Sequence, residues 1–418
     1  MELKKYRLSD IAKIEISGVD KKTKEGEMPV RLCNFVDVYH NWAITNSLYD
    51  NFMCASAKEA EIAKCSIRKG QVAITKDSET RDDIGIATYI ADDFADVLLG
   101  YHCALITPNE NILDGKYLNA FMHTSYIQKY FENNASGSGQ RYTLSNDTIS
   151  NIPILLPSLE EQQRIGAILS NIDRKIELNK AINDNLEAMA KQLYDYWFVQ
   201  FDFPNEEGKP YKSSGSEMVY NERLKREIPK GWEILHLADC LSYKTERVDK
   251  SEIQKTDFYT PIEVIPRKQM SLNETVPIEE AVSGICRYKK GNILLSNRRV
   301  YFHKVCIAPF DGLTRDTVIV LEPIRKELLA YYYETVFSEK FIAYATKHSY
   351  GSEQPVLSWS AAQKFEILKP TNQLDYKFST VVDNIIETVL NNHKEIGQLN
   401  KLRDELLPLL MNGQLTIA

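Results

Sequence analysis

Residues 158–198 carry an apolar pattern that constrains the fold more than any other part of the chain. Apolar side chains recur there at steps of three and four, which places them along one side of a helix. Ser158 and Glu161 follow Pro157 with the spacing of a capping box, which marks the start of the helix. A helix of this length extends about 60 Å and needs a partner helix to cover its narrow stripe. The stripe consists of Ile165, Leu169, Ile172, Ile176, Ile182, Leu186, Met189, Leu193 and Trp197.

The C-terminal part of the chain supplies that partner as a second copy of the pattern, displaced by 213 positions. Pro157 corresponds to Pro370, and Asn179, a polar break in the first stripe, corresponds to Asn392. A buried Asn in such a seam fixes the register at some cost in stability. We therefore predict an internal repeat of a globular unit followed by a long helix. The predicted interface of the helix pair consists of Ile165, Leu169, Ile172, Ile176, Asn179, Leu186, Leu193, Val382, Ile385, Val389, Asn392, Leu399 and Leu406.

The composition is typical of an ordinary soluble protein with two or three domains: 43% of the 418 residues are hydrophobic and 26% are charged. No run approaches eighteen apolar residues, and the N-terminal sequence lacks the apolar core of a signal peptide. The seven cysteines are scattered without CxxC spacing, which indicates reduced thiols and neither a disulfide framework nor a zinc site. We therefore expect a cytoplasmic protein that binds no metal and no membrane.

The formal net charge of -7 argues against a chain that coats itself in nucleic acid unaided. It leaves DNA binding open, because local basic patches count and a partner can bring its own positive surface. Acidic residues outnumber basic ones between Pro157 and Asp202. The first long helix is therefore expected to act as a spacer and a protein-contact element, away from any DNA.

Short runs rich in β-branched and aromatic residues, separated by polar turns, predict an α+β fold class with mixed globular domains. A segment rich in Gly, Pro, Ser and charge then predicts an extended linker. The predicted parts are a first domain at 1–156, a central long helix at 157–200, the linker at 201–229, a second domain at 230–371 and a C-terminal long helix at 372–412.

The two globular domains repeat one plan. An amphipathic helix predicted at 115–133 corresponds to one at 326–347. A glycine-serine loop at 134–145 follows the first helix, and a polar loop at 348–358 follows the second. Each domain therefore offers the same loop at the same place in its sequence.

Four motifs carry a resemblance to a known family: PSLEEQ at 157–162, AILSNIDRKIELN at 167–179, GKPYKSSGSEM at 208–218 and IPKGW at 228–232. With the duplicated plan, the chain closely resembles the specificity subunit of type I restriction-modification systems over nearly its whole length. The second helix departs from the first motif, since PTNQLDY stands at 370–376 where the first copy has PSLEEQQ.

The resemblance implies that the chain has no catalytic centre and binds no cofactor. Each globular domain would be a target-recognition domain for one half of a split DNA target, and the helices would pair as an antiparallel coiled coil that sets the distance between the halves. Two methylation subunits would dock on the helices and use S-adenosylmethionine to methylate adenine, and translocase-nuclease subunits would join for restriction. A 60 Å spacer suits two major-groove sites at least one turn, roughly 34 Å, apart.

Polar loops in both domains carry the side chains that contact DNA in other proteins. Arg can bind guanine with two hydrogen bonds, Asn and Gln suit adenine, and Lys and His suit phosphate. The alternative is that such loops are solvated hairpin tips, as most charge clusters are. The predicted DNA contacts are Lys76, Ser78, Arg81, Gln140, Arg141, Tyr142, Asn297, Arg298, Arg299, Tyr301, His303, Lys304, Ser352 and Gln354.

Two other classes of function would explain part of the sequence. A coiled-coil scaffold that organises proteins without DNA recognition would explain the helices, but it would not need duplicated globular domains with basic-polar loops. An autonomous enzyme is disfavoured because the sequence contains no GxGxxG before a helix, no GxxxxGK[ST], no methyltransferase-type Asn/Asp-Pro-Pro-Tyr/Phe and no HExxH.

Overall fold

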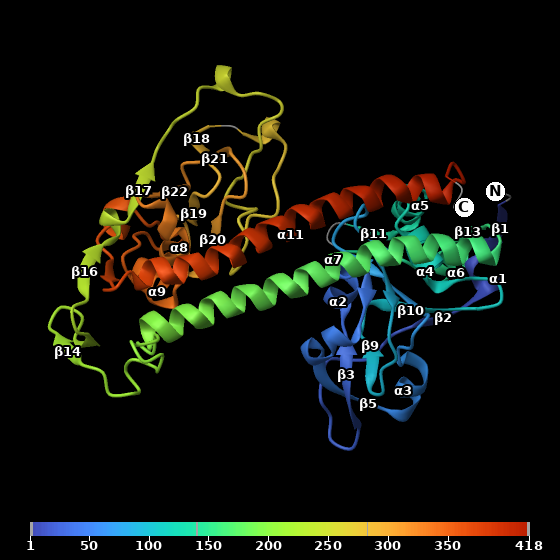
Figure 1. Cartoon of the computed structure of the whole chain (residues 1–418). Coiled ribbons are helices and arrows are strands. Elements are labelled where there is room, and N and C mark those ends of the chain that lie inside the picture. Colours follow the sequence, from blue (N-terminus) through green and yellow to red (C-terminus); the bar gives the residue numbers. More distant parts are fainter. Residues whose placement is uncertain (1–2, 139–140, 282, 416–418) are drawn as a thin grey trace. The chain divides into compact units, whose positions relative to one another are not determined.

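The computed structural model describes residues 3–138, 141–281 and 283–415. The chain forms two compact units, the first of Met1–Glu177 with Gln398–Ala418 and the second of Leu178–Gly397. Each unit combines a globular α+β domain with a part of both long helices (Figure 1). In the described part of the chain, no helix has the length and hydropathy of a membrane span.

The described residues of the first unit form a five-stranded sheet, two three-stranded sheets and one strand pair; the five-stranded sheet and the sheet that contains β3 (Met28–Cys33) are mixed. In sheet order, the strands are β2 (Ala12–Ile16), β10 (Cys103–Pro108), β6 (Val72–Thr75), β8 (Ala87–Ile90) and β4 (Ala43–Ile44); β5 (Met53–Ala57), β3 (Met28–Cys33) and β9 (Val97–Leu99); β11 (Ser136–Ser138), β12 (Arg141–Thr143) and β7 (Asp77–Ser78); and β1 (Lys4–Arg7) with β13 (Pro153–Leu156). Its short helices are α1 (Leu8–Ile11), α2 (Phe35–His40), α3 (Glu59–Cys65), α4 (Gly115–Met122), α5 (Ser125–Asn134) and α6 (Asn146–Ser150).

In the part of the second unit that the structure describes, the strands form a four-stranded antiparallel sheet and three strand pairs. In sheet order, the strands are β17 (Leu241–Lys244), β22 (Val318–Pro323), β19 (Ile293–Ser296) and β20 (Val305–Ile307); β18 (Ile285–Tyr288) with β21 (Gly312–Arg315); β16 (Glu233–His236) with β23 (Glu366–Lys369); and β14 (Met218–Asn221) with β15 (Arg226–Pro229). Its short helices are α8 (Leu329–Phe337), α9 (Glu339–Lys347) and α10 (Trp359–Ala362).

Each predicted amphipathic helix is in fact two helices, α4 and α5 in the first unit and α8 and α9 in the second. Thr124 caps α5, because its hydroxyl accepts a hydrogen bond from the Ile127 amide. Ser338 caps α9 in the same way with the Phe341 amide. A hydroxyl side chain that satisfies free amides starts a new helix inside an uninterrupted apolar pattern, so periodicity alone did not show the break.

The two long helices are α7 (Leu159–Tyr194), which continues into a π-helical turn (Asp195–Val199), and α11 (Leu374–Met411). Within the first unit, Ile165 near the start of α7 shares one hydrophobic core with Leu410 near the end of α11. Within the second unit, Tyr194 near the end of α7 shares a core with Phe378 near the start of α11. The helices therefore pair antiparallel, and the predicted fold class is confirmed.

The buried face of α7 departs from the predicted stripe after Asn179. Ile182 and Met189 are exposed by 38% and 57%, and the neighbouring Asn183 and Ala190 are buried instead. A straight helix has 3.6 residues per turn, so positions that repeat every seven residues rotate gradually around its axis. The residues that face the core are therefore displaced by one position from the predicted stripe. Of the predicted interface, Ile165, Leu169, Ile176, Asn179, Val382 and Val389 are buried, whereas Ile172, Leu186, Leu193, Ile385, Asn392, Leu399 and Leu406 are half-buried.

The two asparagines that correspond in the repeat do not bond to each other. In the second unit, Asn179 donates a hydrogen bond from Nδ2 to Glu395 Oε2 at 2.7 Å. Asn392 donates from Nδ2 to Asn183 Oδ1 at 2.8 Å. The helix pair thus contains two polar contacts one helical turn apart, which disfavour any register that would leave these groups unpaired.

Residues 201–229 do not form the extended linker that their composition predicts. Phe201 and Phe203 are buried in the core of the second unit. The ring of Phe203 stacks on Tyr211 and on Trp232, with centroids 4.6 Å and 5.4 Å away. The remainder of the segment includes the β14–β15 hairpin. Aromatic side chains bury enough apolar surface to order a segment rich in Gly, Pro and Ser.

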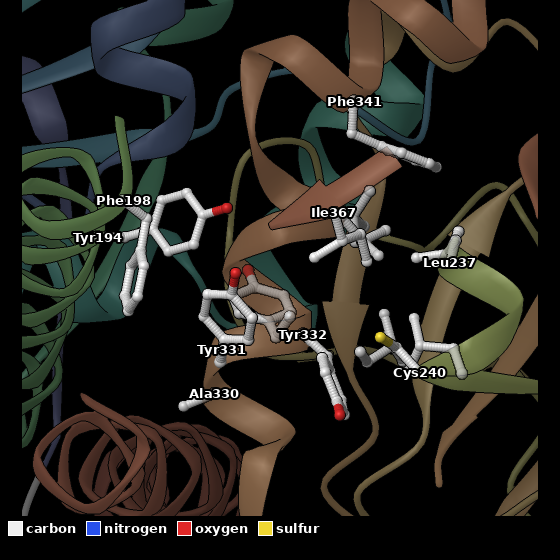
Figure 2. Packing of buried hydrophobic residues seen from close by; sticks show 14 of the residues in the cluster. Tyr194, Phe198, Leu237, Cys240, Ala330, Tyr331, Tyr332, Phe341 and Ile367 are labelled. Carbon is white, nitrogen blue, oxygen red and sulfur yellow. The ribbon is translucent and has the colours of Figure 1, made fainter. Parts of the chain in front are cut away.

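An aromatic cluster joins α7 to the globular part of the second unit (Figure 2). The ring of Phe198 lies 4.7 Å from that of Tyr331 on α8, and Tyr194 lies 6.0 Å from the same ring. The Tyr331 hydroxyl donates to the Leu368 carbonyl. In the first unit the Tyr117 hydroxyl donates to the carbonyl of Leu155, 213 positions before Leu368, at 2.6 Å. The repeat therefore extends to individual hydrogen bonds between a side chain and the backbone.

His123 occupies an apolar site in the first unit. Its ring stacks on Trp42 with centroids 4.3 Å apart, and Arg403 lies over the same indole at 4.7 Å. Nε2 donates a hydrogen bond to the Ala87 carbonyl at 3.0 Å. Burial lowers the pKa of His123 from 6.5 to about 4, with the hydrogen bond to Ala87 opposing this shift and the charge of Arg403 adding to it.

The first unit is expected to lose stability as the pH falls from 6.5 towards 4. In this window the unfolded chain binds a proton at His123 and the folded chain does not, which lowers the free energy of unfolding by about 1–2 kcal/mol at pH 5. His123→Gln, which keeps a donor for Ala87, is expected to remove this part of the acid sensitivity. Thermal unfolding at pH 7.5 and pH 5 measures the effect, and an equal loss in both proteins would contradict it.

Candidate DNA interface

In the first unit, two segments predicted to contact DNA become neighbouring strands. Strand β12 pairs antiparallel with β7, with Tyr142 opposite Ser78. The Leu144 amide donates to the Lys76 carbonyl at 2.8 Å, which extends the pairing by one more bond. The glycine-serine loop and the segment from Lys76 thus form one surface, although 64 positions separate Asp77 from Arg141.

The predicted side chains on this surface differ in exposure. Lys76, Ser78 and Tyr142 are half-buried, and Arg81 and Arg141 are exposed. The Arg81 guanidinium lies over the Tyr142 ring, 5.0 Å from its centroid. Such an arrangement holds a cation and a ring together at the surface, where both could contact a nucleotide. Gln140 lies outside the described residues.

His102 and Asp77 are functional candidates that sequence reasoning missed. Asp77 Oδ2 lies 2.5 Å from Nδ1 of His102 and 3.4 Å from Nη2 of Arg141. Burial would raise the pKa of the Asp77 carboxyl, but hydrogen bonds from Thr143 and His102 outweigh burial and lower it. Asp77 is therefore a carboxylate at neutral pH, able to hold a positive or hydrogen-bond-donating neighbour.

Two cavities flank these side chains, with volumes of about 520 Å³ and 470 Å³. Asp77, His102 and Arg141 line both. On the side of the larger cavity, the Tyr39 hydroxyl donates to the Asp83 carboxylate at 2.8 Å. The Arg141 guanidinium therefore stands at the rim shared by two hollows.

The second unit repeats the pairing of the two loop segments. The Leu357 amide donates to the Asn297 carbonyl at 2.8 Å, which matches the bond between Leu144 and Lys76. Arg298 pairs with Val356 in an isolated antiparallel bridge. Arg298 is exposed and Asn297 half-buried, and Ser352 and Gln354 are exposed on the facing loop. The predicted contacts of this unit thus also gather on one surface.

An aromatic ring holds two arginines beside this surface. The guanidinium of Arg267 lies 4.1 Å from the centroid of Phe302, and that of Arg299 lies 6.0 Å from it. Arg299 has a left-handed backbone with φ of 47°, and the adjacent Tyr301 is 49% exposed. Sequence reasoning missed Arg267, because it lies 31 positions before Arg298 and only the fold brings it to this turn.

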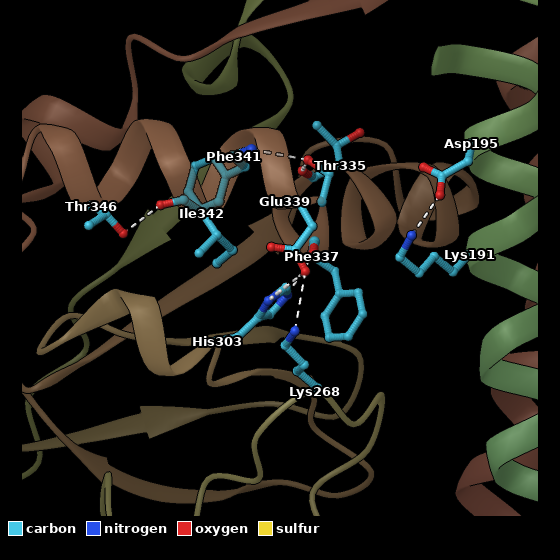
Figure 3. Close-up of polar contacts among 11 residues, drawn as sticks. Lys191, Asp195, Lys268, His303, Thr335, Phe337, Glu339, Phe341, Ile342 and Thr346 are labelled. Carbon is cyan, nitrogen blue, oxygen red and sulfur yellow. Dashed lines mark hydrogen bonds and ion pairs between the residues drawn. The ribbon is translucent and has the colours of Figure 1, made fainter. Parts of the chain in front are cut away.

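The structure corrects the prediction for His303 (Figure 3). Its side chain is buried, and Nε2 lies 2.7 Å from the Phe337 carbonyl, which can only accept. Nδ1 lies 3.7 Å from Glu339, which also pairs with Lys268. Burial lowers the pKa of His303, which favours the neutral ring. These contacts hold His303 within the protein and argue against the predicted DNA contact at this residue.

Lys304 is likewise committed to the protein. Its ammonium donates to the carbonyl oxygens of Ile262 and Glu263, at 2.7 Å and 2.9 Å. Burial lowers the pKa of this amine, with the charge of Arg267 acting in the same direction. These bonds argue against the predicted phosphate contact at Lys304, since the charge was visible in the sequence but its bonds to the backbone were not.

Among the described residues, no group of three or more His, Cys, Asp or Glu side chains is placed to hold a metal ion. Comparison with known families finds a match to the type I restriction modification DNA specificity domain over residues 1–188 and 229–401. The chain belongs to this family. Each matched range contains one copy of the repeat, since each covers a globular domain and most of a long helix.

Curated members of this specificity family match most of the chain. The type I restriction enzyme MjaIX specificity subunit of Methanocaldococcus jannaschii is 28% identical over 384 residues, which cover 86% of this chain and 81% of that protein. The HindI specificity subunit of Haemophilus influenzae is 25% identical over 409 residues, covering 84% of this chain and 88% of that protein.

The crystal structure of the type I restriction-modification S subunit from M. genitalium has the same fold. It aligns with a TM-score of 0.56 and 16% identity, covering 98% of this chain and 96% of that one. The resemblance expected from the four motifs is thus confirmed, and the order of domain, helix, domain, helix is the order of this specificity fold.

Proposed function

We propose that the chain is the DNA-recognition subunit of a type I restriction-modification complex, with each unit recognising one half of a bipartite target. The strongest support for the same role in both units is a backbone hydrogen bond that they share. In each unit the same backbone bond, Leu144 to Lys76 and Leu357 to Asn297, joins two polar segments into one exposed surface. A coiled-coil scaffold would have no use for two such surfaces.

The helix pair in this proposal spaces the two recognition domains and binds two methylation subunits. Apolar side chains on α7 that face away from its core support a protein-binding role: Leu178, Ile182 and Met189 are exposed by 54%, 38% and 57%. Burial of such side chains in a complex stabilises it by the hydrophobic effect.

The chemistry would belong to the partners. The methylation subunits would bind S-adenosylmethionine, translocase-nuclease subunits would complete the restriction complex in the cytoplasm, and this chain would contribute binding without a cofactor or a catalytic centre of its own. An acidic chain with net charge -7 is consistent with DNA binding inside an assembly that supplies further positive charge.

Co-expression with the genes that neighbour it tests the proposal. The expected result is an assembly of this chain with two copies of a methyltransferase that methylates adenine in one split motif. A chain that purifies alone, or with proteins that neither bind nor methylate DNA, would favour the scaffold and overturn the proposal.

Arg298→Ala is expected to weaken specific DNA binding by the assembled complex by about 1–3 kcal/mol, because an exposed arginine on this surface can bind a base edge. Arg325→Ala is the matched control: that side chain pairs with Glu327 and lies outside both polar segments. Fluorescence anisotropy with target and scrambled duplexes measures both variants. Equal losses on the two duplexes would instead identify a phosphate contact.

A further inference from the structure

The side chains of Asp77, His102 and Arg141 form a graded cluster in the first unit, whose role the fold alone does not explain. The exposed fraction rises from 12% for Asp77 to 28% for His102 and 61% for Arg141. An ion pair exposed to this degree contributes little to stability. The cluster therefore has to be explained by what its exposed end can contact.

His102 adds a second observation, because its backbone is left-handed with φ of 71°. Such a conformation is costly for any residue with a side chain and persists where the surroundings enforce it, often at functional sites. It directs the imidazole to Asp77 and Arg141, within hydrogen-bond distance of both. The strained backbone of His102 thus helps to position the side chains of Asp77 and Arg141.

The protonation of the cluster follows from its partners. Asp77 can only accept, so Nδ1 of His102 carries the proton that bonds to it. The other ring nitrogen, Nε2, lies 3.3 Å from Nη2 of Arg141. Nη2 also lies 2.7 Å from Nδ1 and 3.4 Å from Oδ2 of Asp77, so the imidazole ring and the carboxylate both lie against this one nitrogen of the guanidinium.

These contacts are all made through Nη2, and the exposed Arg141 side chain lines both cavities. A guanidinium positioned through one nitrogen still offers further N–H groups, and these can bind O6 and N7 of guanine with two parallel hydrogen bonds. A phosphate can bind the same N–H groups, but a phosphate contact carries no sequence information, so selectivity for a base distinguishes the two. We propose that Arg141 recognises a guanine in the half-site of the first unit, with Asp77 and His102 as positioning residues.

The proposal rests on the proposed function, since it names one base within the target. The second unit offers an internal control: Gln354 stands 213 positions after Arg141, and Arg298 follows the residue that corresponds to Lys76. Among the described residues of the second unit, Arg298 and Gln354 thus stand where the first unit has Asp77 and Arg141, and the pair of acid and guanidinium is not repeated there. Changes to the cluster should alter one half of the target and leave the other unchanged.

The test uses the complete methyltransferase complex and a library of duplexes with random half-sites. Arg141→Ala is expected to lower the preference for guanine at one position of one half-site about 10- to 100-fold. Arg141→Lys is not expected to restore it, because an ammonium cannot form the two parallel bonds. Asp77→Asn and His102→Asn, the second chosen because Asn tolerates a left-handed backbone, are expected to lower the same preference by a smaller factor.

A measurement on the DNA keeps the test independent of protein folding. In the half-site of the first unit, 7-deazaguanine in place of guanine removes the N7 acceptor; it is expected to weaken wild-type binding about 10-fold and to leave Arg141→Ala binding unchanged. Uniform loss on all sequences, full rescue by Lys, or equal effects of 7-deazaguanine on both proteins would overturn the proposal. A wild-type complex that selects no sequence would instead overturn the proposed function.

Discussion

Phe378→Ala is expected to lower the free energy of unfolding of the second unit by about 3–5 kcal/mol. The ring is fully buried, at 0% exposure, where α11 meets α7. It lies edge-on to Phe198 with centroids 5.2 Å apart, and 5.9 Å from Tyr194. Removing it leaves a cavity among rigid aromatic rings that cannot collapse to fill the space. The variant therefore loses the free energy of burying the ring and also bears the cost of the cavity.

Tyr376→Ala is the matched control, because this ring lies two positions earlier on the same helix and is 46% exposed. It is expected to change the free energy of unfolding by no more than about 0.5 kcal/mol. Urea denaturation of the isolated chain, followed by circular dichroism, measures both variants. Similar midpoints for the two variants would contradict the packing of Phe378 described above.

Gly115→Ala is expected to destabilise the first unit by about 3 kcal/mol, the upper part of the range for overpacked sites. A Cβ atom there would lie 2.1 Å from the Gly70 carbonyl oxygen and 3.2 Å from the ring of Tyr89. The first of these atoms belongs to the backbone next to β6, so it cannot swing aside as a side chain would. The start of α4 would have to move away from the sheet.

Gly397→Ala is the opposite case. Gly397 lies inside α11, and a Cβ atom there would meet no atom within 4 Å. The substitution is expected to stabilise the helix by up to about 1 kcal/mol, because Ala loses less backbone entropy than Gly. Thermal unfolding of the two variants beside the unaltered chain measures both changes, and a stabilised Gly115→Ala variant would rule out the close approach of α4 and Gly70.

The long helices and the duplication were the parts of the fold most accessible to sequence reasoning. Both helices lie within three residues of their predicted bounds, apart from the π-helical end of the first. Prediction was less successful where a local pattern competes with a capping side chain, as at Thr124 and Ser338. It also failed where aromatic residues order a polar segment, as Phe203 does.

For the candidate interface as well, the sequence indicated the segments but not the contacts that their side chains make. The two segments of each unit were named from residue type, but His303 and Lys304 in them proved to be bonded to backbone carbonyls of distant residues. Asp77 and His102 gave no signal, because 25 positions separate them and their contact depends on strand pairing. Arg267 was missed for the same reason.

Helical periodicity, capping patterns and repeats depend on neighbours within a few positions or on matching stretches, and both are written directly in the order of residues. The chain alone therefore established two domains, two long helices and their pairing. Which face of α7 is buried, which cations are exposed and which acid supports Arg141 depend on contacts between residues far apart in the chain. Burial is a property of the packed fold, and only the folded arrangement decides it.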